Sequence, residues 1–162
     1  MAEVASRQLT GGCQCGATRY ALAAPPLFAY CCHCANCQRI TASAFAISCI
    51  VPKAALVFTK GAPARHEWTA DSGTPRYGFF CPDCGVRIAH GQEGDGPSAA
   101  MYSLRGGTLD DRGYAAPVAH IWMSSAVPWF AVPQGDLTFE AQPKDYAPIA
   151  ALYAARLTGV AG

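Results

Sequence analysis

Eight of the nine cysteines fall into three short groups, and this grouping constrains the fold of the 162-residue chain more than any other feature. The groups are "GGCQCG" with Cys13 and Cys15, "CCHCANC" with Cys31, Cys32, Cys34 and Cys37, and "FCPDCGVRI" with Cys81 and Cys84. Closely spaced thiolates repel one another unless a cation lies between them. The chain must therefore fold so that these groups become disulfides, redox centres or metal sites.

Several observations favour metal. Nine is an odd number, so complete pairing into disulfides within the chain is impossible. The opening stretch "MAEVASRQLT" lacks the apolar core of a secretory signal, which predicts a cytoplasmic protein. In a reducing cytosol, closely spaced cysteines more often bind metal or perform redox chemistry than form structural disulfides. We therefore expect at least one metal site.

Charge and hydropathy argue against two classes of partner. The formal net charge is +1 and only 14% of the residues are charged, so the chain has no basic surface suited to a nucleic-acid backbone or an acidic membrane. No apolar run approaches the roughly 18 residues that a membrane-spanning helix needs. We expect neither nucleic acid nor a membrane as a partner, and the length suits one well-cored domain.

Short apolar runs between glycine and proline turns predict an all-β protein. Seven runs alternate or are rich in β-branched and aromatic residues, and their even spacing favours a sandwich or barrel. They are "ATRYAL" (17–22), "FAISCIV" (45–51), "ALVFT" (55–59), "RYGFF" (76–80), "VRIAH" (86–90), "AAMYSL" (99–104) and "HIWM" (120–123). After the middle cysteine group, "ITASAFA" (40–46) predicts one helical turn.

The last part of the chain differs from the rest. We divide the sequence into a cysteine-rich domain of residues 1–135 and a C-terminal extension of residues 136–162 that belongs to the same body. A short amphipathic helix is predicted in the extension, beginning near residues 145–146, with Pro148 in its first turn and Gly159 at its end. Its apolar face would hold Ile149, Leu152, Tyr153 and Leu157. We expect this face to pack on the β body; a homodimer formed through the helix is the alternative.

The segment "CPDCG" has the form of a zinc knuckle. Cys81 and Cys84 lie three positions apart with a turn between them and Gly85 behind, so backbone amides can point at both sulfurs. Such a knuckle supplies half of a tetrahedral four-thiolate site. The redox interpretation of C-x-x-C expects a βαβ context, and the sequence has none. Metal is the better interpretation, although ligand type alone does not distinguish zinc from iron.

Spacing alone leaves two pairs that could complete this site. They are Cys34 with Cys37, and Cys13 with Cys15. The second choice leaves a middle group of three thiolates, Cys32, Cys34 and Cys37. Structural zinc sites are closed by four ligands, whereas catalytic sites keep one position open. The residues thus predict two clusters, at least one metal and an open site if the second pairing holds.

Taken together, the motifs resemble the family of glutathione-dependent formaldehyde-activating enzymes, which shares its domain with the centromere protein V group. The matching segments cover residues 9–135 in the family's order. They are "GGCQCGATRY", "CHCANCQR", "SAFAISCIV", "FTKG", "FFCPDCGVRI", "YSLRGGTLDD" and "HIWMSSAVPWF". The resemblance implies a β-tent (Mss4-like) fold of twisted antiparallel sheets.

The resemblance also implies two zinc positions. A structural zinc would be held by Cys13, Cys15, Cys81 and Cys84, and a catalytic or labile zinc by Cys32, Cys34 and Cys37. The reaction that it implies joins formaldehyde to the thiol of glutathione, a carbon–sulfur lyase activity. A substrate thiol could fill the fourth position of the open site, where coordination would deprotonate it near neutral pH.

Three other interpretations stay open at this point. A paralogue could act on another thiol or another small electrophile at the same open site. A zinc-stabilised module could bind nucleic acid or protein instead, although the scattered charge does not favour it. Both metals could also serve the fold alone.

Two residues outside the clusters are further candidates for the catalytic site. Arg39 could balance the charge of the thiolates or hold a substrate carboxylate, and a solvated turn residue is the competing interpretation. His120 would share a strand face with Trp122, and the resemblance suggests that this segment lies near the second zinc. A substrate-binding or proton-handling role is one interpretation of His120, and packing in the core is the competing one. His33 alternates with the ligands and should point away from them. Cys49, inside an apolar run, is expected to be a buried hydrophobe.

Overall fold

The computed structural model describes residues 8–70 and 73–159, which form two β-sheets and two α-helices. The smaller sheet has the order β1 (Leu9–Gly12), β2 (Arg19–Leu22) and β5 (Leu56–Lys60). The larger sheet has the order β11 (Leu137–Thr138), β10 (Ala119–Ile121), β3 (Phe28–Cys32), β4 (Ala46–Pro52), β9 (Met101–Arg105), β8 (Arg87–Gln92), β7 (Pro75–Phe80) and β6 (Ala64–Thr69). The predominance of strands confirms the prediction of a mainly β protein, and the β-tent assignment stays a prediction.

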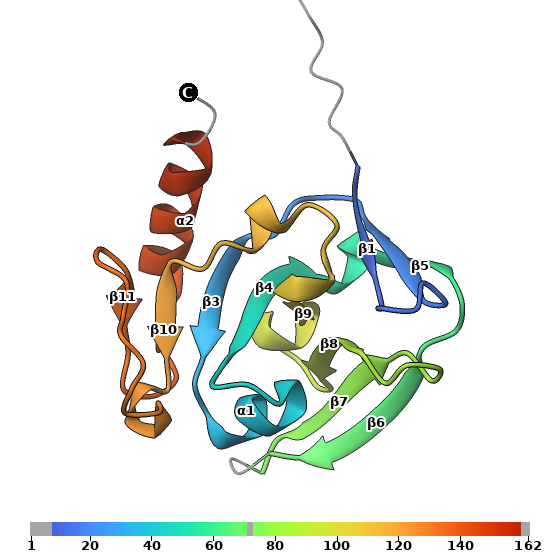
Figure 1. Ribbon diagram of the computed structural model, residues 1–162, viewed down its shortest axis with the longest axis horizontal. Helices are drawn as coiled ribbons and strands as arrows, with labels where there is room; N and C mark the ends of the chain where they lie inside the picture. The colour runs from blue at the N-terminus through green and yellow to red at the C-terminus, as the bar shows by residue number, and fades with distance from the viewer. Residues whose placement is uncertain (1–7, 71–72, 160–162) are drawn as a thin grey trace, which may run out of the picture.

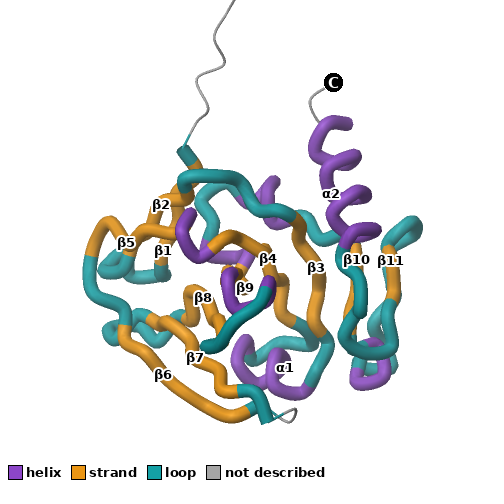
Figure 2. The backbone as a smooth tube through the Cα atoms, turned by 180° about the vertical axis from the view of Figure 1, so that it is seen from behind, coloured by secondary structure: helices purple, strands orange, loops and turns teal. Residues whose placement is uncertain are grey.

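Most strand pairs are antiparallel, and the centre of the large sheet is its most buried part. All five residues of β3 are buried, and β4 and β9 beside it contribute the fully buried Cys49 and Leu104. The strands from β3 to β6 curve around the short helix α1 (Ala35–Thr41), while β1, β2 and β5 lie on the side of the molecule away from α2 (Ala147–Gly159) (Figures 1 and 2). The curvature places α1 inside the bend of the sheet.

All seven predicted strand runs contain a strand, but the sequence patterns missed β1, β3, β6 and β11. In β3 the run "FAYCC" is buried throughout, so it lacks the polar alternation that indicates a strand. Its two cysteines belong to the group that predicts metal binding. In β6 the run "ARHEWT" is largely exposed and charged, as an edge strand of a sheet can be. The predicted strand at 120–123 ends at Ile121, because Trp122 adopts a left-handed conformation with φ 62°.

The helical turn predicted at 40–46 was misplaced. The helix α1 begins five residues earlier, at Ala35, and ends at Thr41. Its N-cap is Cys34, whose sulfur accepts a hydrogen bond from the Cys37 amide, and Ala42 ends it with φ 48°. Cysteine is not among the usual capping residues, so the pattern gave no start signal there.

The C-terminal helix α2 agrees closely with its prediction. Its first turn is capped by Asp145, whose carboxylate accepts from the Ala147 amide, and it ends at Gly159. Ile149 and Tyr153 are buried, and the helix packs against β3 of its own chain. The intramolecular packing of the helix is therefore confirmed, and the homodimer stays a prediction. Neither described helix has the length and hydropathy needed to cross a membrane.

Candidate metal centres

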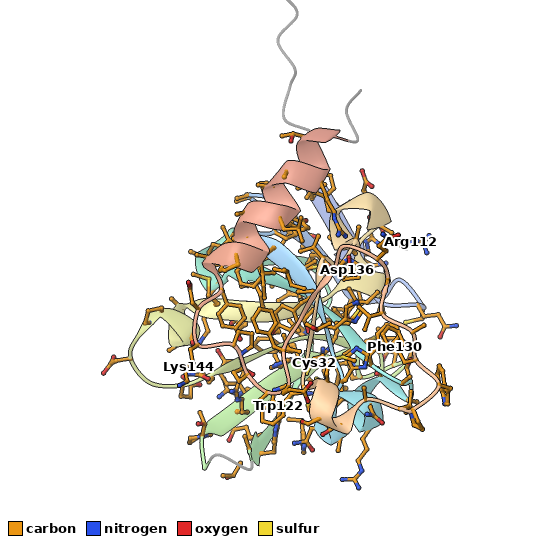
Figure 3. The ribbon with its side chains drawn as sticks, turned by 90° about the vertical axis from the view of Figure 1, so that its left-hand side faces the viewer. Cys32, Arg112, Trp122, Phe130, Asp136 and Lys144 are labelled. Carbon is orange, nitrogen blue, oxygen red and sulfur yellow. The ribbon has the colours of Figure 1, made fainter. Side chains whose placement is uncertain are left out.

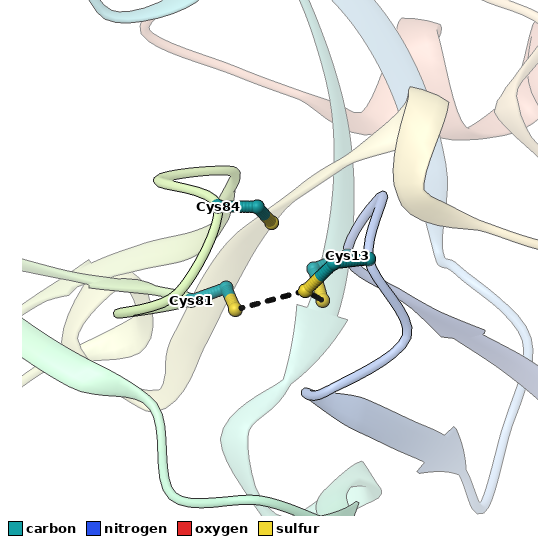
Figure 4. Close-up of side chains that lie close together, drawn as sticks. Cys13, Cys81 and Cys84 are labelled. Atoms are coloured by element: carbon teal, nitrogen blue, oxygen red, sulfur yellow. Dashed lines mark hydrogen bonds between the residues drawn. The ribbon is translucent and has the colours of Figure 1, made fainter.

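The first cluster joins two turns that are far apart in the sequence. Cys13 and Cys15 lie in the turn between β1 and β2, and Cys81 and Cys84 lie in the turn between β7 and β8. Their four sulfurs lie within 4.8 Å of one another. The Sγ atoms of Cys13 and Cys15 are 3.6 Å apart, and those of Cys15 and Cys81 are 3.8 Å apart. Figure 4 shows Cys81 and Cys84 facing the turn that carries Cys13.

Backbone amides shape both turns around the sulfurs. The Thr18 amide donates to Cys13 Sγ at 3.2 Å, and Gly16 takes φ 77° in the same turn. In the second turn Gly85 takes φ 74°, and its amide donates to the Cys81 carbonyl at 2.8 Å. Glycine is the residue that adopts this left-handed conformation without strain. The "CPDCG" knuckle predicted from the sequence is therefore present.

Electrostatics show that these four sulfurs share a crowded site. Although burial opposes it, hydrogen bonds from the Thr18 amide and the neighbouring thiols lower the pKa of Cys13 to about 6. Despite a hydrogen bond from the Ala17 amide, the sulfurs of Cys13 and Cys84 raise the pKa of Cys15 to about 12. One thiolate thus forms at the expense of its neighbour. A divalent cation would remove this competition.

The second cluster lies within one short segment. Cys32 is the last residue of β3, Cys34 is the N-cap of α1, and Cys37 is on the buried side of that helix. Their three sulfurs lie within 4.8 Å of one another, and those of Cys32 and Cys34 are 3.5 Å apart. In the described part of the chain, no fourth Cys, His, Asp or Glu joins this group. Cys31, the neighbour of Cys32, is buried outside it.

In this cluster the negative charge gathers on Cys34. Hydrogen bonds with the Cys32 and Cys37 thiols, together with backbone amides, lower the pKa of Cys34 to about 2. The Cys34 sulfur, the Cys37 sulfur and burial raise the pKa of Cys32 far above its ordinary value. For Cys37, hydrogen bonding with Cys32 lowers the pKa, but Cys34 and burial outweigh it and the pKa is raised.

The sulfur positions fit a tetrahedral metal. Bonds of ~2.3 Å to zinc place the sulfurs of a tetrahedral site roughly 3.8 Å apart. The Sγ–Sγ distances of 3.5, 3.6 and 3.8 Å are close to that value in both clusters. The structure therefore brings together each ligand set that the resemblance implied, and each set could hold a metal ion.

Beside the three-cysteine cluster lies a row of buried side chains. His33 Nε2 is 3.0 Å from His120 Nδ1, and His120 Nε2 donates to Asp136 Oδ2 at 3.0 Å. Asp136 also accepts from Arg156 Nη1 at 2.6 Å, on helix α2. Both imidazoles pack against the ring of Phe130, and Figure 3 labels Phe130 and Asp136 on the side of the molecule that also carries Cys32. A carboxylate only accepts, so His120 donates from Nε2 to Asp136, and its Nδ1 faces His33 Nε2.

This row agrees with the hydrogen-bonding role expected for His33. His33 is fully buried, and its Nδ1 has no hydrogen-bond partner in the described structure. Burial, and then the charge of His120, lower the pKa of His33. His33 is therefore neutral near pH 7.

A comparison with protein families identifies the chain. The model of the family "Glutathione-dependent formaldehyde-activating enzyme" matches residues 8–125, which include both cysteine clusters. The chain belongs to this family. A comparison with curated proteins gives no match. Among solved structures, a crystal structure of a Rhodobacter sphaeroides protein is similar at 19% sequence identity and a TM-score of 0.49, covering 80% of this chain and 98% of that one.

The formaldehyde-activating family match ends before Asp136 and Arg156, which sequence reasoning also missed. Nothing in the pattern around Asp136 links it to His120, because a contact between a loop and a buried strand end leaves no periodic signal. The predicted shared face of His120 and Trp122 is wrong. The left-handed Trp122 turns away from the strand, and its indole donates to Gln142.

Arg39, the other residue predicted to belong to the catalytic site, lies on the outer side of α1. It lines an open cavity of about 550 Å³ with Gln38 and Trp129. Two helical positions separate Arg39 from Cys37, a rotation of roughly 200° around the helix axis. Arg39 is exposed whereas Cys37 is buried. The structure therefore does not bring the Arg39 side chain toward the three sulfurs. Cys49 is fully buried, as predicted.

Proposed function

We propose that the protein is a zinc-dependent enzyme that joins a thiol such as glutathione to a small aldehyde such as formaldehyde, at the three-cysteine cluster. The observation that carries this proposal is the incomplete ligand set. Cys32, Cys34 and Cys37 have sulfurs at tetrahedral spacing, and no fourth protein ligand accompanies them in the described residues. Membership of the formaldehyde-activating family supplies the substrate classes.

The reaction requires a deprotonated thiol. Cys32, Cys34 and Cys37 would hold a zinc ion, whose positive charge would keep a bound substrate thiol ionised and nucleophilic near neutral pH. The sulfur then attacks the aldehyde carbon. A carbon–sulfur bond forms, the π bond of the carbonyl breaks, and the proton that left the thiol ends on the former carbonyl oxygen. The product is a hydroxymethyl thioether, with no change of oxidation state overall.

The chain's own residues would orient the site and handle the proton. The Cys37 amide holds Cys34 Sγ at the start of α1, which fixes the direction of that ligand. Both ring nitrogens of His120 are bonded within the protein, so in this proposal His120 acts through His33 instead of touching substrate. His33 Nδ1 is buried and has no hydrogen-bond partner in the described structure, so it is the nitrogen of this row that is free to accept a proton. Arg39 would contact the outer part of a longer substrate at the cavity on α1.

A cysteine exchange tests this function. Cys34→Ser should abolish enzyme-dependent formation of the hydroxymethyl adduct, measured by NMR exchange above the spontaneous rate, while the circular dichroism spectrum stays that of the wild type. Cys31→Ala is the matched control, because Cys31 adjoins the cluster without joining it, and it should retain activity. Full activity in Cys34→Ser would refute the proposed role of the cluster.

A further inference from the structure

A buried arginine without a carboxylate lies near the three-cysteine cluster. Arg105, at the end of β9, is only 5% exposed, and none of the ion pairs in the described structure involves it. Its Nη1 donates to Ser48 Oγ at 3.1 Å and its Nη2 to His90 Nδ1 at 3.0 Å, while its Nε has no partner. Buried charges are normally paired, so this arginine calls for an anion.

A second arginine approaches the same place from β8. The guanidinium of Arg87 lies over Gly78, where a Cβ atom would come within 2.0 Å of Arg87 Nη1. Its Cζ is 5.6 Å from the centre of the Trp68 ring. Arg87 Nη1 is buried and has no hydrogen-bond partner, and no carboxylate pairs with it in the described residues. Burial, and then the charge of Arg105, lower the pKa of Arg87.

The strand register puts both arginines on the face of the sheet that carries Cys32. Ser48 pairs with Arg105 on one side and with Tyr30 on the other, and side chains of paired residues share a face. Tyr30 and Cys32 lie two positions apart on β3, so they share it too. Gly78 pairs with His90, which brings Arg87 to the same face. Figure 1 shows these strands curving around α1, which carries Cys37.

His90 also lies on this face, where it contacts Arg105. Burial, followed by the charges of Arg105, Arg76 and Arg87, holds the pKa of His90 well below its ordinary value. A neutral His90 accepts from Arg105 and adds no compensating negative charge. The two guanidinium groups therefore repel each other here, and among the described residues no carboxylate forms an ion pair with either of them. The charge of Arg105 already acts on the Cys37 thiol in the direction that lowers its pKa, although hydrogen bonding with Cys32 is the stronger lowering effect.

We propose that Arg87 and Arg105 form a carboxylate-binding site for the thiol substrate. Their unpartnered N–H groups, Arg87 Nη1 and Arg105 Nε, would donate to one carboxylate while the sulfur of the same molecule reaches the three-cysteine cluster. Charge-assisted hydrogen bonds from arginine to carboxylate are strong and directional. The identity of the ligand rests on the proposed function, because the anion-binding groups alone do not specify a thiol. The substrate class that follows is a thiol bearing a carboxylate, in preference to a neutral thiol.

Binding of a blocked thiol tests this site separately from catalysis. S-methylglutathione keeps both carboxylates but has no free thiol, and calorimetry can measure its affinity for the zinc-loaded protein. Arg87→Met and Arg105→Lys should each weaken its binding by about 10- to 100-fold, the loss expected for charge-assisted hydrogen bonds. The dimethyl ester of S-methylglutathione should not bind. Arg87→Met should disturb the fold less than Arg105→Lys, because the Arg87 side chain is only partly buried.

Arg65→Met is the matched control. Arg65 also lies over an aromatic ring, 3.9 Å from the centre of Tyr77, but it has its own carboxylate partners in Glu67 and Glu93. It should leave the affinity unchanged. Equal binding by Arg87→Met and the wild type, or equal binding of ester and acid, would overturn the proposal. An effect of Arg87→Met on zinc content alone would also overturn it, since the arginines would then only balance the thiolates. The Cys34→Ser variant should still bind S-methylglutathione. The carboxylate site can therefore be tested even if the proposed catalytic function is wrong.

Discussion

The two cysteine clusters have the same chemistry and different surroundings. The four-cysteine cluster draws its ligands from two turns on two different sheets, separated by about 70 residues of chain. The three-cysteine cluster lies within one segment of six residues. A metal in the first would close a long loop and tie the sheets together, whereas a metal in the second would close almost none. Their neighbours differ as well: in the described part of the chain, the buried His33 lies between ligands of the second cluster in sequence, and the charge of the buried Arg105 acts on Cys37.

The number of ligands and their separation along the chain therefore indicate the role of a cluster better than the spacing of its cysteines does. A set of four ligands that spans the fold suits a structural role, and a set of three on one segment suits a site with an open position. Substitutions in each cluster and among its neighbours test this division of roles.

The largest expected effect is the loss of the fold on breaking the four-cysteine cluster. Structural zinc contributes an apparent ~10–16 kcal/mol in small domains, which is comparable to the whole stability of a typical protein. We expect Cys81→Ser to be unfolded or strongly destabilised in thermal denaturation followed by circular dichroism. Cys34→Ser should melt close to the wild type. If the two variants lose equal stability, the division of labour between the clusters is wrong.

The next effect concerns the buried row beside the open site. The Asp136 side chain is only 3% exposed, and its removal leaves His120 Nε2 without an acceptor. We expect Asp136→Ala to lower the free energy of unfolding by about 2 kcal/mol. Arg156→Met is the control, because that side chain is 39% exposed and its ion pair should contribute less than about 1 kcal/mol. Urea denaturation of both variants measures this difference; equal losses would contradict the importance given to the Asp136–His120 contact.

A smaller effect should appear in the pH dependence of stability. Burial, and then the charge of Arg105, hold the pKa of His90 well below the ordinary value of 6.5. The unfolded chain therefore takes up a proton near pH 6.5 that the folded chain does not, so the contribution of this group is present above pH 6.5 and is lost as the pH falls.

His90→Gln keeps a hydrogen-bond acceptor for Arg105 and does not titrate. Between pH 6.5 and about 5.5, its free energy of unfolding should fall by about 1 kcal/mol less than that of the wild type. Parallel curves for the two proteins would show that His90 titrates normally in the fold.

The smallest effect is expected at Arg39. Because this side chain lies on the outer side of α1, Arg39→Ala should change kcat/KM for a carboxylate-bearing thiol by less than about 3-fold, under 0.7 kcal/mol. Arg87→Met should have a much larger effect in the same assay. The reverse order would restore Arg39 as the main carboxylate contact and sharpen the distinction between the two sides of the helix.

The cysteines lie together in the structure in the two groups that were expected, whereas the residues around them were mostly missed. Tight spacing in C-x-C and C-x-x-C is a local signal, and the family resemblance chose between the two pairings that spacing left open. Arg39 was chosen because it follows the cluster in sequence, yet the helix turns it outward. Arg105 and Asp136 reach the site through contacts between distant segments, which no periodicity records. One signal was available: an arginine ending the apolar strand "MYSLR" is an unusual buried charge.

The sequence also predicted some elements of the fold and missed others. Strands with alternating or β-branched residues were found, whereas β3 was hidden because it is buried on both faces. The start of α1 was missed because a cysteine serves as its N-cap, and that role depends on the same sulfur that would bind the metal.

The most direct test is X-ray absorption spectroscopy at the zinc edge, which counts the sulfur neighbours of each metal. With both clusters loaded, our account predicts an average of about 3.5 sulfurs per zinc, rising to about 4 when glutathione is added. Cys34→Ser should not show the rise. An average of four sulfurs before any thiol is added, or no change upon addition, would contradict the open site.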